Sequence, residues 1–226
     1  MNRWTHPTLT HRETPEGRPL SWKKDLKTHE RRKRAAALFA QVTNGVKVIY
    51  VCSHKGMNRP DSYVADTERF YNYVAAYTFE RVLMCADDWP GASQRVNIRF
   101  GQVKGIDDEL TRNYFELKRY GQQWHGLPWG ALASLKWVSA DQYEMSQVAD
   151  VYAGFMKASV WPDEFGATEG AYIQAIWHQI RRAHGCALGF GIKGMPVQEV
   201  FTGQDWWTCP CKTSRGAAKC PRGPTN

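Results

Sequence analysis

The residues best suited to chemistry are two acids on expected helices. One of them is Asp150, in the segment SQVADVYAG over 146–154. Helical spacing places Asp150 on the same side of the helix as two small residues, Ser146 and Gly154. An apolar face adjoins that side, so we expect the helix to pack on the body of the protein with Asp150 at the edge of the contact. A carboxylate in that position needs a hydrogen-bond donor, an arginine or a divalent cation as its partner.

The second acid is Glu80, in a long helix that we predict from Asp66 to Cys85. The aromatic and apolar residues of this helix recur at the spacing of one buried face, and Glu80 is in phase with Tyr77 and Met84. The pattern therefore predicts an inward-pointing carboxylate. Either Arg81 or another cation neutralises it, or it belongs to a functional site.

The elements that must position these acids alternate between strands and helices. In chain order we predict a helix over 28–41, a strand over 46–52, the helix over 66–85, a strand over 95–100, a helix over 108–119, a strand over 132–138, the Asp150 helix, and a helix over 169–183. This alternation predicts a mixed α/β sheet flanked by helices. We expect an extended arm over 1–22, one domain over 23–204, and a basic, cysteine-containing tail over 205–226.

Composition narrows the setting of the protein. The chain has 226 residues, of which 42% are hydrophobic, and no apolar run approaches the roughly 20 residues that span a bilayer. The first residues also lack the apolar centre of a secretion signal. We therefore expect no membrane segment, a cytoplasmic location and free thiols.

The formal charge of +8 is concentrated in two groups. Seven lysines and arginines lie between Lys23 and Arg34, and four more follow Trp207. Such clusters are typical of a protein with a polyanionic partner, although a solvated charged face is the competing interpretation. We expect a nucleic acid partner, with contacts from Lys24, Lys27, Arg31, Arg32 and Lys55.

The cysteines near the end of the chain offer a second kind of chemistry. Cys209, Cys211 and Cys220 could supply three thiolates to zinc, and Cys186 or His184 could complete a tetrahedron. Their spacing differs from that of the common paired zinc knuckles, so we favour free thiols in the tail and do not expect zinc.

Five short motifs, together with the order of the elements, resemble the DUF-3800 family of ribonuclease-H-like proteins, often from bacteria and their phages. The motifs are LSWKKDLK at 20–27, HK at 54–55, YNYV at 71–74, FERV at 79–82 and QVAD at 147–150. The resemblance covers roughly residues 20–195. It implies a central mixed sheet on which acids converge to bind divalent metal.

By this resemblance, Glu80 is the acid of the first core helix and Asp150 the acid of the last. The family normally opens with a strand bearing Asp-Glu-Ser-Gly, which this chain lacks before Lys23, and Gln102 stands near the expected fourth acid. Asp107, Asp141 or Glu144 would have to substitute for missing ligands. The resemblance thus implies an N-terminally shortened ribonuclease-H-like fold.

The function expected from these features is nucleic acid binding, with metal-dependent hydrolysis of phosphodiester bonds as the ancestral chemistry. If the chain is an active nuclease, Glu80 and Asp150 hold magnesium or manganese. The alternative is a non-catalytic phage or prophage interaction protein that acts through protein or nucleic acid binding. Because the opening strands are missing, we also expect a second copy or a partner chain to cover an edge of the sheet.

Overall fold

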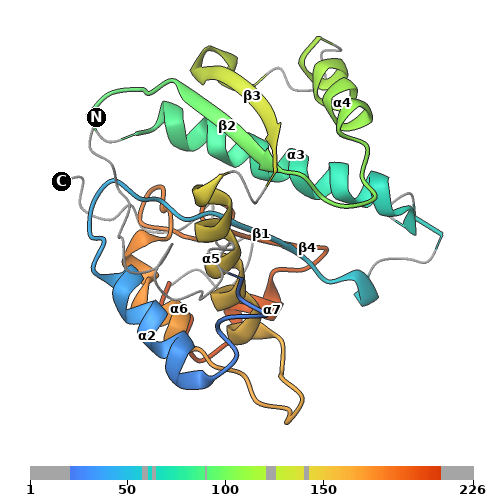
Figure 1. The fold of residues 1–226 in the computed structure, drawn as a ribbon. Helices are drawn as coiled ribbons and strands as arrows, with labels where there is room; N and C mark the ends of the chain where they lie inside the picture. Colours follow the sequence, from blue (N-terminus) through green and yellow to red (C-terminus); the bar gives the residue numbers. More distant parts are fainter. Residues whose placement is uncertain are drawn as a thin grey trace. The chain divides into compact units, whose positions relative to one another are not determined.

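The structure is a computed structural model that describes residues 21–57, 61–62, 65–89, 91–120, 126–139 and 143–209. Its fold is mixed α/β with small sheets, as the alternation of strands and helices predicts. The chain divides into two compact units (Figure 1). Unit 1 takes its described residues from 1–48, 138–180 and 204–208, and unit 2 takes its own from 49–137, 181–203 and 209–226.

Unit 1 is helical. Its elements are α2 (His29–Ala40), α5 (Glu144–Val160), α6 (Ala171–Ala175) and the 3-10 turn η4 (Trp177–Gln179). The side chain of Thr28 accepts a hydrogen bond from the backbone N–H of Arg31 and so caps α2, close to the start of the helix predicted over 28–41. Aromatic rings fill the core, and Phe39 meets Tyr152 and Phe155 edge to face.

A close approach between Trp22 and α5 closes one side of unit 1. Trp22 is buried and meets Phe155 edge to face, and a Cβ atom at Gly154 would overlap the indole ring. Only glycine at 154 therefore lets the ring sit against the helix. Trp206 is buried in the same unit, where its indole N–H donates to the carbonyl of Ser159 at 2.9 Å. Trp22, the last residue of the expected arm, and Trp206, in the expected tail, are thus both packed in unit 1.

The predicted helix over 169–183 is wrong in length. Helix α6 ends at Ala175, η4 follows, and Ile180 is extended and bridges to Val48 in parallel. The backbone N–H of Val48 donates to the carbonyl of Gln179 at 2.8 Å. An isolated parallel bridge to the sequence-distant Val48 has overridden the helical periodicity of this segment.

Unit 2 contains a parallel pair of strands. Strand β1 (Tyr50–Ser53) pairs with β4 (Ile192–Met195), so that Tyr50 lies opposite Ile192 and Ser53 opposite Met195 (Figure 1). The expected strand over 46–52 is therefore displaced toward the C-terminus. The 3-10 turn η1 (Lys55–Met57) follows β1, and the short helix α7 (Glu199–Thr202) follows β4.

A second pair of strands, β2 (Val96–Gly101) and β3 (Leu132–Val138), lies along α3 (Thr67–Asp87) in Figure 1. The helix α4 (Asp108–Tyr120) and the turn η3 (Trp129–Ala131) complete this part of unit 2. All three predicted elements over 95–138 are confirmed within a residue or so. Their shared core is built on Phe79, Leu83, Ile98 and Phe115.

The buried face of α3 differs from the predicted one. Ala75, Phe79 and Leu83 are buried, whereas Tyr77 and Glu80 are only half-buried. The helix contacts both β1 and the core beside β2. The face that carries Tyr77 and Glu80, which was expected to be buried, lies at the edge of these contacts. Glu80 therefore keeps a third of its side chain exposed (32%).

None of the described helices has both the length and the apolar character to cross a bilayer.

Candidate functional site

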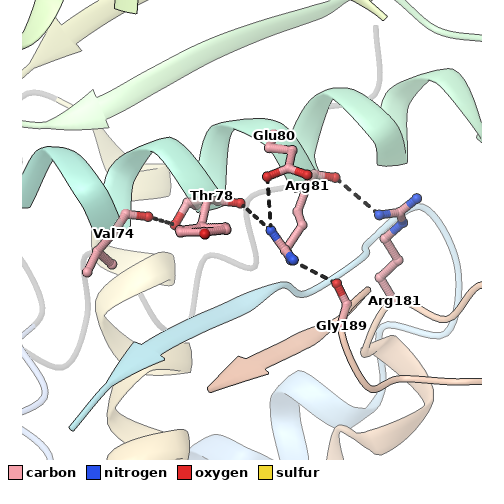
Figure 2. A network of polar contacts seen from close by, with 7 residues as sticks. Val74, Thr78, Glu80, Arg81, Arg181 and Gly189 are labelled. Atoms are coloured by element: carbon pink, nitrogen blue, oxygen red, sulfur yellow. Dashed lines mark hydrogen bonds and ion pairs between the residues drawn. The ribbon is translucent and has the colours of Figure 1, made fainter. Parts of the chain in front are cut away.

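Glu80 lies beside the cation that follows it in the sequence. Its Oε2 atom is 3.5 Å from Nη1 of Arg81, which is much more buried than Glu80 (Figure 2). The same guanidinium donates from Nη1 to the carbonyl of Tyr77 at 3.1 Å and from Nε to the carbonyl of Gly189 at 2.8 Å. The sequence left two interpretations of Glu80: neutralisation by a cation such as Arg81, or membership of a functional site. The structure agrees with the first, because Arg81 lies close enough to neutralise the carboxylate.

Arg81 joins α3 to the turn that precedes β4. Figure 2 shows its side chain pointing from the helix toward Gly189, while its own carbonyl accepts a hydrogen bond from Nη1 of Arg181 at 3.3 Å. Arg181 in turn forms an ion pair with Asp88 at 2.8 Å. Burial lowers the pKa of Arg81, and the negative charge of Glu80 acts in the opposite direction.

A second cation, Lys193, lies beside Tyr77, one turn before Arg81 on α3. Lys193, on β4, has its Nζ atom 5.7 Å from the ring centroid of Tyr77. Burial and the charge of Arg81 lower the pKa of Lys193, whereas Glu80 raises it. Glu80 is thus already paired with Arg81, and the positive charge of this arginine opposes the entry of a divalent metal ion at Glu80.

Asp150 lies on α5 in unit 1, where it also has a protein partner. Its Oδ2 atom accepts a hydrogen bond from the backbone N–H of Trp22 at 3.0 Å. Trp22 opens a turn closed by Asp25, whose Oδ2 accepts from the backbone N–H of Ser21 at 2.8 Å. Asp150 therefore fixes the segment that carries Trp22 onto α5, which accounts for an acid among small residues without a metal.

Of the acids expected to substitute for missing ligands, Asp107 has a structural role, and Glu144 is the first residue of α5. Asp107 caps α4, because its Oδ1 accepts from the backbone N–H groups of Glu109 and Leu110. Gln102 donates to Asp108 Oδ2 at 2.6 Å. Asp141 lies outside the described residues.

Across the described ranges, no group of three or more His, Cys, Asp or Glu residues could hold a metal ion. Glu80 belongs to unit 2 and Asp150 to unit 1. Their convergence on one metal cluster stays a prediction.

The basic cluster lies on α2 and the turn before it. Lys23, Lys24, Lys27 and Lys33 are exposed, and no ion pair joins them to another residue in the described part of the chain. Two of the expected phosphate ligands have structural partners instead. Arg31 Nη1 donates to the carbonyl of Asp25 at 3.1 Å, and Arg32 Nε donates to that of Leu26 at 2.7 Å, with its guanidinium 4.8 Å from the Trp22 ring centroid.

Lys55 begins η1, directly after the carboxyl end of β1. At this edge the buried atoms Ser53 Oγ, His54 Nδ1 and Gln198 Oε1 have no hydrogen-bond partner among the described residues. The parallel register brings the ends of β1 and β4 to the same edge, and the N–H of His54 donates to the carbonyl of Met195 at 2.9 Å. The carboxyl edge of parallel strands is a common ligand position. Sequence reasoning gave no role to Ser53 or Gln198 and quoted His54 only within the HK motif. For Ser53 and His54, the available signal was a polar run directly after an apolar strand.

Of the three cysteines expected in the tail, the structure describes Cys209. Cys209 is buried with its Sγ atom 3.7 Å from Sγ of Cys186, while Cys211 and Cys220 lie outside the described residues. Cys52 is half-buried as a residue, and burial raises the pKa of its thiol to about 12.

Comparisons with protein-family models, curated proteins and solved structures found no match to this chain. The resemblance to the DUF-3800 family therefore rests on the quoted motifs and the order of the elements.

Proposed function

We propose that this chain binds nucleic acid through the basic surface formed by Lys23, Lys24, Lys27 and Lys33. The observation that carries the proposal is that these four lysines are exposed and lack ion-pair partners among the described residues. Ammonium groups in this state are available to phosphates, and their neutralisation of a polyanion releases counterions. Lys55, after the carboxyl end of β1, is a further phosphate contact in this proposal.

Within the same proposal, the fold is ribonuclease-H-like. The alternation of strands and helices supports this assignment, as does the presence of Glu80 and Asp150 on α3 and α5, the helices to which the family motifs assign them. Each sheet among the described residues has two strands, and the proposal includes a second copy or a partner chain that pairs with a strand edge.

Replacing Lys23, Lys24, Lys27 and Lys33 together by glutamine should weaken nucleic acid binding and flatten its salt dependence. Each phosphate contact contributes about 0.9 to the slope of log K against log salt on duplex DNA, so the loss of four contacts lowers the slope by roughly 3 to 4. Fluorescence anisotropy with short labelled DNA and RNA, single- and double-stranded, over a range of salt concentrations measures this slope. Arg31 and Arg32 stay unchanged, because their loss would disturb the turn that they hold.

The matched control replaces four exposed lysines elsewhere, Lys47, Lys104, Lys136 and Lys157, by glutamine. It makes the same change in net charge and should leave most of the slope in place. Equal effects of the two variants would show that only net charge matters and would refute the assignment of the surface. No binding to any probe at low salt would refute the function and would leave the protein-interaction alternative.

For the chemistry, we expect the isolated chain to show little or no nuclease activity. Glu80 is paired with Arg81 and Asp150 accepts a hydrogen bond from the N–H of Trp22, so neither is poised to fix two divalent ions. Incubation with magnesium or manganese and a panel of DNA and RNA substrates measures the activity. Asp150→Asn is the control for contaminating enzymes, because its amide oxygen can still accept from Trp22. Strong cleavage that this variant abolishes would overturn the non-catalytic interpretation and restore the magnesium or manganese site.

A further inference from the structure

Helix α4 carries an apolar stripe that the fold of unit 2 does not bury. The buried residues of the helix are Thr111 and Phe115, and Phe115 belongs to the core cluster of this unit. Leu110 and Leu117 lie two turns apart beside the buried side and are exposed, at 52% and 73%. Tyr120, at 75%, follows one turn later. Large apolar side chains that recur along one face indicate an interaction surface, whereas single ones do not.

The two ends of α4 carry opposite charges. Asp108 and Glu109 lie in the first turn, and Lys118 and Arg119 lie in the last. The guanidinium of Arg119 is 5.5 Å from the ring centroid of Trp129, a contact that does not neutralise its charge. The helix therefore runs from an acidic end to a basic end over a length of about 20 Å.

This pattern is complementary to its own reverse. A two-fold axis beside Asn113, at the middle of the helix, lays α4 of a second copy antiparallel to the first. Leu110 of each copy then meets Leu117 of the other, and each acidic first turn meets a basic last turn. A parallel arrangement places acid beside acid and base beside base. The charges therefore select the antiparallel arrangement.

The residue at the middle of the stripe suits the same arrangement. Asn113 is exposed and lies one turn after Leu110 and one turn before Leu117. Its amide both donates and accepts hydrogen bonds, so two copies of Asn113 can pair across the two-fold axis. A single polar residue within an apolar helix seam disfavours other registers, because they leave its amide without a partner.

We propose that two copies of this chain associate through the α4 face, formed by Leu110, Asn113, Leu117 and Tyr120, with the two helices antiparallel. One short helix from each copy buries less surface than the roughly 1,200 to 2,000 Å² of stable complexes. The dimer is therefore weak and reversible. Its interface is a helix face and not a strand edge, and it does not depend on the nucleic acid proposal.

The first test is the oligomeric state of the full chain under reducing conditions, which prevent disulfide cross-links between copies. Sedimentation velocity from roughly 1 to 500 µM should show a monomer–dimer equilibrium. Leu110→Ser and Leu117→Ser together should raise the dissociation constant by about tenfold or more, because each substitution occurs twice in a symmetric interface. The matched control, Met145→Ser with Phe165→Ser, removes two comparably exposed apolar side chains from unit 1 and should leave the constant unchanged.

Two results of this experiment would contradict the proposal. One is a chain that stays monomeric over the whole range of concentrations. The other is a dimer that the two leucine substitutions leave intact, because its interface must then lie elsewhere, for example at a strand edge. Circular dichroism of each variant shows whether loss of the dimer is accompanied by loss of the fold.

The second test determines the direction of the pairing. Glu109→Lys alone places a lysine beside the basic last turn of the other copy and should weaken the dimer. Adding Lys118→Glu to the same chain restores opposite charges at both ends of the interface and should recover most of the affinity. These differences should shrink at high salt, which screens exposed charges. A folded double variant that associates no better than Glu109→Lys would rule out the antiparallel arrangement.

Discussion

Replacing Arg81 by methionine should lower the free energy of unfolding by about 2 to 4 kcal/mol. The substitution keeps an unbranched side chain but removes the donors to the carbonyls of Tyr77 and Gly189 and the partner of Glu80. Each hydrogen bond to a charged group contributes about 1.5 to 3 kcal/mol, and part of that loss is recovered by hydration at the half-exposed Glu80. Urea denaturation followed by tryptophan fluorescence measures the change.

Two further variants separate the roles of the charge and the geometry at this site. Arg81→Lys keeps the charge but cannot reach two carbonyls in fixed directions, so its stability should lie between those of the original and the methionine variant. Glu80→Gln leaves the carbonyl contacts of Arg81 in place and should change stability by less than about 1 kcal/mol. If Arg81→Met were as stable as the unchanged protein, the network in Figure 2 would contribute nothing to the fold.

Replacing Gln179 by leucine should cause a larger loss, about 3 to 5 kcal/mol. Gln179 is almost fully buried, and its side-chain nitrogen donates to the carbonyls of Phe39 at 2.6 Å and Val42 at 2.8 Å. Its side-chain oxygen accepts from the hydroxyl of Tyr152 at 2.6 Å. Leucine would leave these buried polar groups without that partner, and each such group carries a desolvation penalty of about 1 to 3 kcal/mol. Chemical denaturation of the variant gives the loss directly.

The partner substitution Tyr152→Phe is the control for this network. Burial raises the pKa of Tyr152 to about 12, so its hydroxyl is protonated and donates at neutral pH. Tyr152→Phe removes one hydrogen bond and should destabilise by about 1 to 2 kcal/mol, while the double variant with Gln179→Leu should lose less than the sum of the two. Strict additivity would show that the two side chains act independently, contrary to their contact.

The sequence predicted those elements whose signals are local. Thr28 caps α2 as expected, and Asp66 caps α3 through the backbone N–H of Arg69, because a short polar side chain satisfies the first free N–H groups of a helix wherever it occurs. The spans of β2, α4 and β3 also agree with apolar spacing. The predicted helix over 169–183 is wrong for the opposite reason. Its helical spacing is real, but the pairing of Ile180 with the sequence-distant Val48 determines the backbone conformation at the end of the segment.

The candidate site shows the same division. The sequence by itself indicated that Glu80 and Asp150 need partners, since a carboxylate near an apolar contact is unstable alone. Tertiary structure decided which partners they have: Arg81 and the backbone of Trp22, the latter 128 residues from Asp150. It also decided that Arg31 and Arg32 hold a turn while the neighbouring lysines stay exposed, and that Cys186 meets Cys209. Residue type and spacing determine what a side chain requires, whereas only the folded chain brings distant groups close enough to satisfy it.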